Sequence, residues 1–341
     1  PLGIGLLNKI KKEWHSWDTG VNTYLGNDYL TTNKDAIDTD HQFYNFTTNE
    51  AFIQTLLYIK NNFQKETPLA VKTETQFKYS KQAATFDGFQ VSLPHGNFLR
   101  CSYFFNESSA FEYFYRIQRE RKIWWMKYSC NPGRYKLCDL RSETVNNQKV
   151  QSVSIKSKFN FGDIHIENIY FVPLRASTTE IINELSMKDR RTGKRGLPVV
   201  IRTEFCLESA ALALLMDAIE NSKRGKIAIH RKVAPYQCSV FCHSEDSKIL
   251  TELTDLAKHL CNVTRNSGIS TLNLEKCYSQ NEEMLTKELL EMDKVGVPYS
   301  LILEKETLNT GLIKLRNRDT TVSEIIHISD VPDYLLKILN S

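Results

Sequence analysis

The sequence predicts an α+β domain over residues 1–225, with an antiparallel sheet flanked by helices, followed by an α/β domain over residues 226–341. Strand-like segments dominate the first part, whereas strand and helix patterns alternate after residue 236. A basic stretch at residues 222–233 separates the two patterns and marks the boundary. The chain has 341 residues, of which 41% are hydrophobic and 25% charged, so it is long enough for two or three domains with cores of their own.

In the first domain, hydrophobic periodicity predicts helices at 49–63 and 109–128. The second helix mixes aromatic and basic residues, a combination that can stack on nucleic-acid bases. Packing of large aromatic side chains on a sheet explains the same pattern, and we favour that interpretation. Strands that would form the antiparallel sheet are predicted at 85–93, 97–105, 150–159, 164–172 and 197–206.

In the second domain, strands alternate with helices of ten or more residues, which predicts a covered and mostly parallel sheet. Thr321-x-x-Glu324 matches a capping box, so a further helix is expected directly after the last strand. The expected order is a strand at 236–242, a helix at 247–261, a strand at 269–274, a helix at 280–293 that starts at Ser279, strands at 297–303 and 311–316, and a closing helix at 331–340.

The net charge of +4 is too small to indicate nucleic-acid binding by itself, but the cations are clustered. Alternation along the strand at 311–318 places Lys314, Arg316 and Arg318 on one face. A single cluster can be a solvated loop; several together predict a polyanionic or acidic partner. The other candidate contact residues are Arg190, Arg191, Lys194, Arg195, Lys223, Arg224, His230, Arg231 and Lys232.

No catalytic, metal or cofactor site is predicted. The eight cysteines include no Cys-x-x-Cys pair, and Cys238 and Cys242 fall on one strand face, where they favour core positions over metal binding. Scattered histidines and the surface acid pair Glu282-Glu283 do not form an acid/base arrangement. No apolar run reaches the roughly 18 residues that cross a bilayer, so a soluble chain with reduced thiols, without a membrane partner, is expected.

The strand that ends in Arg316-Asn317-Arg318-Asp319-Thr320 resembles the last strand of the anticodon-binding domain of class II aminoacyl-tRNA synthetases. Ala234-Pro235 and the strand after it resemble the start of that domain. In the first domain, Leu93-Pro94-His95-Gly96 and Phe104-Phe105-Asn106-Glu107 resemble the second motif of the glycyl enzymes. The resemblance implies a class II synthetase-like first domain and an anticodon-binding-like second domain.

Two arginines that bind ATP in that family are missing here. The resemblance places Phe105 where the second motif has the arginine that holds the α-phosphate. The third motif, Gly-x-Gly-x-acid-Arg-Leu, matches Cys206 to Leu212, with Ala211 in place of its arginine. Residues 197–223 contain no glycine and only Arg202 as an arginine, so no shift of register restores the motif. We therefore expect that the chain is not an enzyme.

A narrower resemblance covers Lys305 to Ile313, the Arg-x-Arg-Asp-Thr-Thr string and Ile326 to Ser329, which are similar to the accessory (processivity) subunits of animal mitochondrial DNA polymerase gamma. This resemblance implies a non-catalytic protein of the mitochondrial matrix and nucleoid. It would bind the polymerase catalytic subunit, mainly through the second domain, and primer-template or duplex DNA. Lys314, Arg316 and Arg318 would then form a docking surface.

Vertebrate members of that family dimerise through a helix bundle inserted before the segment that matches Leu93-Pro94. Here only Gln64 to Thr85 occupies that place, which is too short for packed helices. A one-to-one heterodimer without homodimerisation is therefore predicted. Two alternatives stay open: a tRNA-binding protein or synthetase paralogue that retains an anticodon-binding domain, and a scaffold without a nucleic-acid role.

Overall fold

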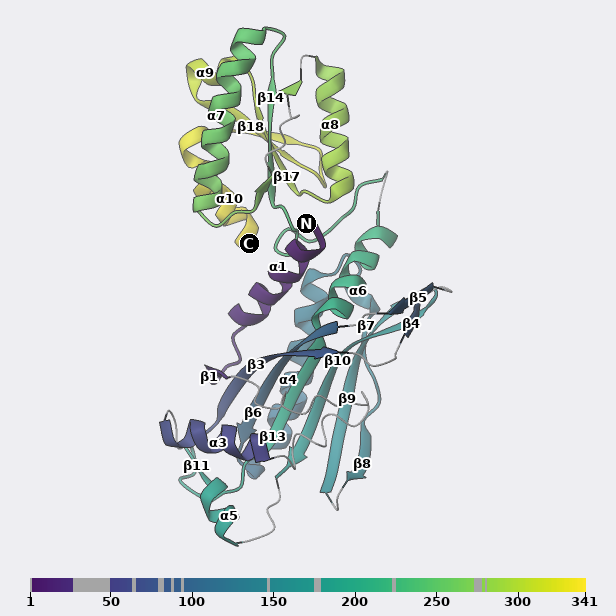
Figure 1. Ribbon diagram of the computed structural model, residues 1–341, viewed down its shortest axis with the longest axis vertical. Coiled ribbons are helices and arrows are strands. Elements are labelled where there is room, and N and C mark those ends of the chain that lie inside the picture. Colours follow the sequence, from purple (N-terminus) through teal and green to yellow (C-terminus); the bar gives the residue numbers. More distant parts are fainter. Residues whose placement is uncertain are drawn as a thin grey trace. The chain divides into compact units, whose positions relative to one another are not determined.

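The computed structural model (Figure 1) describes residues 2–26, 50–62, 66–78, 83–86, 89–92, 95–145, 148–174, 179–222, 225–272, 278–279 and 281–341. Internal contacts divide the chain into two compact units. The central unit comprises His15–Lys127 and Pro132–Ala213, and the C-terminal unit comprises Leu214–Ser341 with Pro1–Trp14 and Tyr128–Asn131. This grouping differs from the expected ranges 1–225 and 226–341, because it assigns Pro1–Trp14, Tyr128–Asn131 and the chain from Leu214 onwards to the C-terminal unit.

The central unit contains an eight-stranded sheet with the order β1-β3-β6-β13-β10-β9-β7, in which β8 also pairs with β9. Every pairing is antiparallel except β1 with β3, which confirms the predicted α+β architecture. The strands are β1 (Asn22–Leu25), β3 (Leu69–Lys78), β6 (His95–Phe105), β7 (Tyr135–Leu137), β8 (Arg141–Val145), β9 (Gln148–Phe159), β10 (Gly162–Pro173) and β13 (Val199–Cys206).

Helix α4 (Glu107–Tyr128) packs its aromatic face on this sheet. The ring of Phe114 lies 5.3 Å from that of Phe171 on β10, and the ring of Trp125 lies 5.0 Å from that of Phe205 on β13. This packing confirms the interpretation that the aromatic residues form a core, although Phe111, whose ring stacks on that of Phe171 at 4.4 Å, and Tyr115 are both half exposed. The other elements are α3 (Glu50–Asn62), α5 (Thr179–Leu185), η2 (Pro132–Arg134), and the short strands β2 (Glu66–Thr67), β11 (Met187–Asp189) and β12 (Arg195–Gly196).

The C-terminal unit contains a mixed sheet with the order β15-β14-β17-β18-β19, in which β16 also pairs with β14. Strand β14 is parallel to its three neighbours, as predicted, but β18 and β19 are antiparallel to theirs. The strands are β14 (Cys238–His243), β15 (Thr271–Leu272), β16 (Tyr278–Ser279), β17 (Tyr299–Leu303), β18 (Leu312–Asn317) and β19 (Ser323–His327).

Helices cover both faces of this sheet (Figure 1). One face carries Cys238, Val240, Cys242, Leu301 and Leu315, which pack against helices α7 and α10 in one core cluster; this confirms core positions for the two cysteines. The other face carries Phe241 and Ile302, which pack against α8. The helices of the unit are α1 (Leu2–Ser16), the end of α6 (Leu207–Glu220), α7 (Ser247–Asn266), α8 (Glu282–Val295), α9 (Lys305–Thr310) and α10 (Val331–Asn340), with the short helix η3 (Ile328–Asp330).

The helix predicted at Thr321-x-x-Glu324 is wrong, because β19 begins at Ser323. The residues between β18 and β19 close a hairpin: the Thr321 amide donates to the Asn317 carbonyl at 2.8 Å, and the Asn317 amide donates to the Val322 carbonyl at 3.0 Å. Thr321 adopts φ 61°, which is incompatible with a helix start. The apolar Ile326 then packs against the core, so strand pairing prevails over the capping pattern.

Two further predictions are corrected. Helix α8 is capped by Asn281, whose side chain accepts from the Met284 amide at 2.8 Å, and not by Ser279. The strand predicted at 85–93 is an antiparallel pair, β4 (Ala83–Phe86) and β5 (Phe89–Ser92). No helix within the described ranges is long and apolar enough to cross a membrane.

Candidate nucleic-acid and partner interfaces

The strand-to-helix junction between β13 and α6 lies where the synthetase resemblance places the nucleotide. Strand β13 ends at Cys206, as predicted, and α6 begins directly after it at Leu207. Glu208, which stands at a glycine position of the motif, accepts a hydrogen bond from the Asn97 amide at 2.8 Å. A carboxylate at this place repels phosphate, and Ala211 offers no cation.

Phe105 is a core residue. It is buried at the end of β6, and its ring stacks on that of Tyr113 from α4, with 3.9 Å between the centroids. Aromatic packing therefore occupies the position that the resemblance assigns to a phosphate-binding arginine. Arg202 is equally internal, because its Nη2 lies 3.3 Å from the buried carboxylate of Glu204, which also pairs with Arg100.

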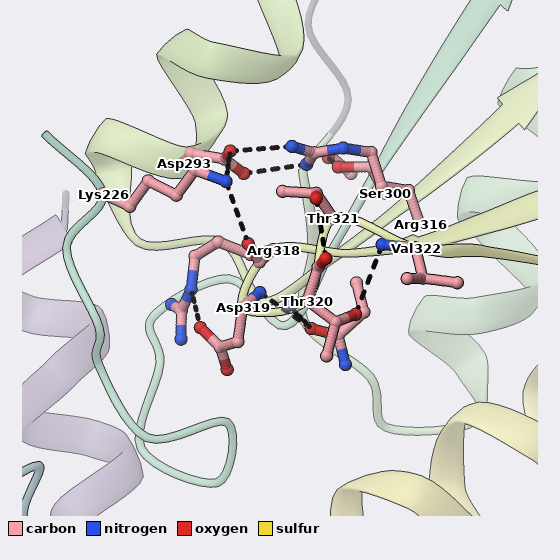
Figure 2. Close-up of polar contacts among 11 residues, drawn as sticks. Lys226, Asp293, Ser300, Arg316, Arg318, Asp319, Thr320, Thr321 and Val322 are labelled. Atoms are coloured by element: carbon pink, nitrogen blue, oxygen red, sulfur yellow. Dashed lines mark hydrogen bonds and ion pairs between the residues drawn. The ribbon is translucent and has the colours of Figure 1, made fainter. Parts of the chain in front are cut away.

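Arg316 on β18 and Arg318 directly after it make their contacts inside the C-terminal unit (Figure 2). Arg316 forms a two-pronged ion pair with Asp293, with nitrogen–oxygen distances of 2.9 and 2.8 Å. Asp293 lies in the last turn of α8, where the helix dipole disfavours a negative charge, so it needs this partner; Lys226 Nζ adds a second at 3.3 Å. Arg316 is 9% exposed and Arg318 only 3%.

Arg318 holds three segments of the chain together. Its guanidinium donates to the carbonyls of Gly296 at 2.9 Å and Ile229 at 3.1 Å, and to the Asp319 carboxylate at 2.8 Å. Lys314 is exposed but pairs with Glu304 at 2.7 Å. The expectation that Lys314, Arg316 and Arg318 all lie on an exposed docking face is therefore wrong for the two arginines, which are buried against Asp293 and backbone carbonyls.

The 230–232 cluster lies at the end of the C-terminal helix. Arg231 Nη2 donates to Ser341 Oγ at 3.0 Å, and Lys232 Nζ donates to the Asn340 carbonyl at 2.9 Å. Cations at a helix C-terminus satisfy its last carbonyls and complement its dipole. The His230 ring packs edge-on against Tyr128 at 5.5 Å. These residues thus have structural contacts of their own, and Lys223 and Arg224 lie outside the described residues.

Four candidate cations gather on the turn between β11 and β12, which we call the basic turn: Arg190, Arg191, Lys194 and Arg195. All four are exposed. Asp189 shapes the turn, accepting from the Arg191 amide at 3.0 Å and from Thr192 Oγ1 at 2.7 Å. Burial by itself would raise the pKa of the Asp189 carboxyl, but these hydrogen bonds outweigh it and hold that pKa below its usual value. Gly193 supplies the positive φ of 73° that closes the turn.

A cavity of about 490 Å³ lies in the C-terminal unit, lined by Lys226, Arg231, Tyr299, Arg318 and Asp319 among others. Its cations already have protein partners: Lys226 pairs with Asp293 and Arg318 with Asp319. Arg231, by contrast, donates to the neutral hydroxyl of Ser341, and Lys226 shares Asp293 with Arg316, so these ion pairs do not compensate all of the positive charge at the cavity. No cluster of three or more metal-ligating side chains occurs in the part of the chain that is described.

Comparison with known proteins gives three findings. The family described as "Anticodon binding domain" matches residues 237–338. The chain is 35% identical over 295 residues to the Drosophila melanogaster protein named "DNA polymerase subunit gamma-2, mitochondrial", covering 83% of this chain and 79% of the fly protein. It is 28% identical over 242 residues to the Bos taurus protein named "DNA polymerase subunit gamma-2", covering 65% of this chain but 46% of the bovine protein.

A more distant similarity involves an enzyme. The chain is 24% identical over 264 residues to the glycine–tRNA ligase of Chlorobaculum tepidum, covering 72% of this chain and 54% of the ligase. Together with the anticodon-binding match, this similarity supports the predicted class II synthetase-like architecture.

Proposed function

This chain belongs to the DNA polymerase subunit gamma-2 family, and from that premise we propose that it is a non-catalytic accessory subunit of a mitochondrial DNA polymerase. It binds the catalytic subunit and primer-template DNA, and it acts in the mitochondrial matrix at the nucleoid. The main support for a non-catalytic role is the β13–α6 junction, where Glu208 and Ala211 replace the glycine and the arginine of a nucleotide site.

The energetic argument against ATP chemistry is simple. Each charge-assisted hydrogen bond from a phosphate-binding arginine contributes about 1.5–3 kcal/mol. Loss of two such arginines removes several of these bonds, and a deficit of about 4 kcal/mol already corresponds to roughly a thousandfold in binding or rate. The carboxylate of Glu208 adds repulsion to that deficit.

Processivity requires no chemistry from this chain, since it is set by the ratio of extension rate to dissociation rate. Each added contact of about 1.4 kcal/mol slows dissociation about tenfold if the association rate is unchanged. The basic turn is the best-placed candidate for DNA backbone contact, because its four cations are exposed on one short segment. Lys223 and Arg224 remain candidates from the sequence alone.

We also propose a one-to-one complex with the catalytic subunit. Support comes from the short stretch Gln64–Thr85, where the resemblance places the dimerising helices of vertebrate relatives: within it, Glu66–Thr67 and Leu69–Lys78 form strands β2 and β3. Light scattering of the isolated 39.4 kDa chain should give the monomer mass. A stable homodimer would overturn this stoichiometry.

The test is primer extension by the mitochondrial polymerase catalytic subunit, with and without this chain, over a range of salt concentrations. We expect longer products in its presence, with the gain persisting to higher salt. The similarity to glycine–tRNA ligases favours one alternative, a tRNA-binding protein. Gel shifts with tRNA and duplex DNA at matched salt decide between them: tight tRNA binding without longer products would refute the accessory role.

A further inference from the structure

Strand β19 is the last strand of its sheet, and no described strand pairs with its outer edge. The phase of the β18–β19 ladder is fixed at its two ends, where the Ile328 amide donates to the Gly311 carbonyl at 2.9 Å and the Asn317 amide donates to the Val322 carbonyl at 3.0 Å. Because hydrogen-bonded and non-hydrogen-bonded pairs alternate in an antiparallel ladder, Glu324 and Ile326 bond to β18. Ser323, Ile325 and His327 direct their N–H and C=O groups outward.

The same three residues project from a sheet face that is only partly covered. The register pairs Ile302 with Lys314 and Lys314 with Ile325, so these side chains share one face. Helix α8 covers Ile302 on that face and contacts β18 through the Asp293–Arg316 pair. Ile325 is 69% exposed and Leu312 45% exposed. The opposite face is covered by α7 and α10.

Proteins usually protect such an edge with proline, lysine or a bulge, because unpaired backbone groups beside apolar side chains invite another strand. The five residues of β19 include neither proline nor lysine, and its ladder with β18 is regular. The one carboxylate, Glu324, lies on the covered face and accepts a hydrogen bond from the Tyr334 hydroxyl. Strand β19 therefore has the features of a docking edge.

We propose that β19 accepts an extended segment of the polymerase catalytic subunit as an additional strand, with an apolar side chain packed over Ile325 and Leu312; the identity of this partner rests on the proposed function. Backbone hydrogen bonds to Ser323, Ile325 and His327 supply affinity, and the exposed apolar face supplies register. Lys314 and His327 flank Ile325 on this face. Because the pair of Lys314 with Glu304 is an exposed surface salt bridge, an acidic side chain in the segment can bind Lys314 as well and complements this face. A second copy of this chain would bring the same basic residues to the face but no carboxylate from its β19, because Glu324 lies on the other face.

The test uses the full chain and measures its affinity for the catalytic subunit by surface plasmon resonance. Ile325→Pro removes one outward N–H and keeps every amide that bonds to β18, and proline is tolerated on edge strands. Ile325→Lys keeps the backbone and removes the apolar contact. The matched control is Leu290→Lys on α8, where the native side chain is 42% exposed. We expect both Ile325 variants to bind at least about tenfold more weakly, with the control unchanged.

Hydrogen exchange gives an independent readout on the native chain. The outward amides of Ser323, Ile325 and His327 should exchange at least about tenfold more slowly in the complex than in the free chain. Native-like affinity of both Ile325 variants, with unchanged exchange at β19, would refute the strand addition and leave the accessory role intact. Failure of the native chain to bind the catalytic subunit refutes both proposals. A homodimer that is abolished by Ile325→Lys would identify a second copy as the occupant, against the proposal.

Discussion

The end of strand β18, together with Arg318 directly after it, carries three cations and the basic turn four, but the fold uses them differently. On β18, the acid in the last turn of α8 pairs with Arg316, and backbone carbonyls surround Arg318. On the basic turn, Asp189 accepts hydrogen bonds from the turn's own amides and a hydroxyl, and the four cations face solvent. A basic string is therefore available to a partner only where no element of the same fold already supplies its counter-charge.

The largest expected effect is on stability, from β18. Arg316→Ala leaves the buried Asp293 with Lys226 as its one remaining ion-pair partner among the described residues, and breaking a buried ion pair of this kind costs about 3–5 kcal/mol. Urea denaturation of the full chain should show a loss of this size in the free energy of unfolding. Asp293→Asn in the same background should recover part of it. A stability equal to that of the native chain would show that Arg316 is not structural and would remove the contrast between the two regions.

The next effect is on DNA binding, from the basic turn. Replacement of Arg190, Arg191, Lys194 and Arg195 by alanine should weaken duplex DNA binding at low salt and leave the unfolding midpoint unchanged. The plot of log affinity against log salt has a negative slope, and each lost phosphate contact reduces its magnitude by about 0.9. We therefore expect the magnitude to fall by up to about 3–4. Alanine at Lys258 and Lys294, exposed lysines of α7 and α8, serves as the control. An unchanged slope would assign DNA contact to other residues.

Lys314 separates the effect of burial from that of position, because it belongs to β18 but is exposed like the cations of the basic turn. Its pair with Glu304 is a surface salt bridge, for which about 0–1 kcal/mol is typical. Lys314→Ala should therefore change the free energy of unfolding far less than Arg316→Ala does, measured in the same urea titration. Equal losses would mean that exposure does not separate the roles of these cations.

The smallest effect is a pH dependence at the basic turn. The folded-state pKa of Asp189 lies below its usual value, so the stabilisation from its ionised form is complete above the unfolded pKa, about 3.9. It is lost as the pH falls through the lower folded pKa. The difference in thermal midpoint between the native chain and Asp189→Asn should be largest near pH 6 and should shrink towards pH 3. A difference that grows on acidification would contradict this anchoring role.

Much of this architecture follows from local pattern. Helix α7, strand β17 and helix α10 lie where periodicity predicts them, and the β13–α6 junction is where the family motif predicts it. Local sequence pattern does not predict which residues from distant parts of the chain pair with one another. The acid that buries Arg316 is 23 residues away on another element, and nothing near Arg316 in sequence identifies it. The hairpin at β19 was obscured because Thr321 and Glu324 fit a helix cap, although the alternation of exposed Ile325 with partly buried Ile326 is a strand signal.

The position of Glu208 has a consequence for whether a nucleotide site could form at this junction. Glu208 and position 211 are three residues apart on α6 and therefore neighbours on its surface. An arginine placed at 211 would form an ion pair with this carboxylate, and the pair would reduce the positive charge that the arginine offers to a phosphate. A nucleotide site would therefore need at least two coordinated substitutions at this junction, neither of which would bind phosphate alone, together with a repacked Phe105. The effects of substitutions at this junction are therefore expected to be strongly non-additive.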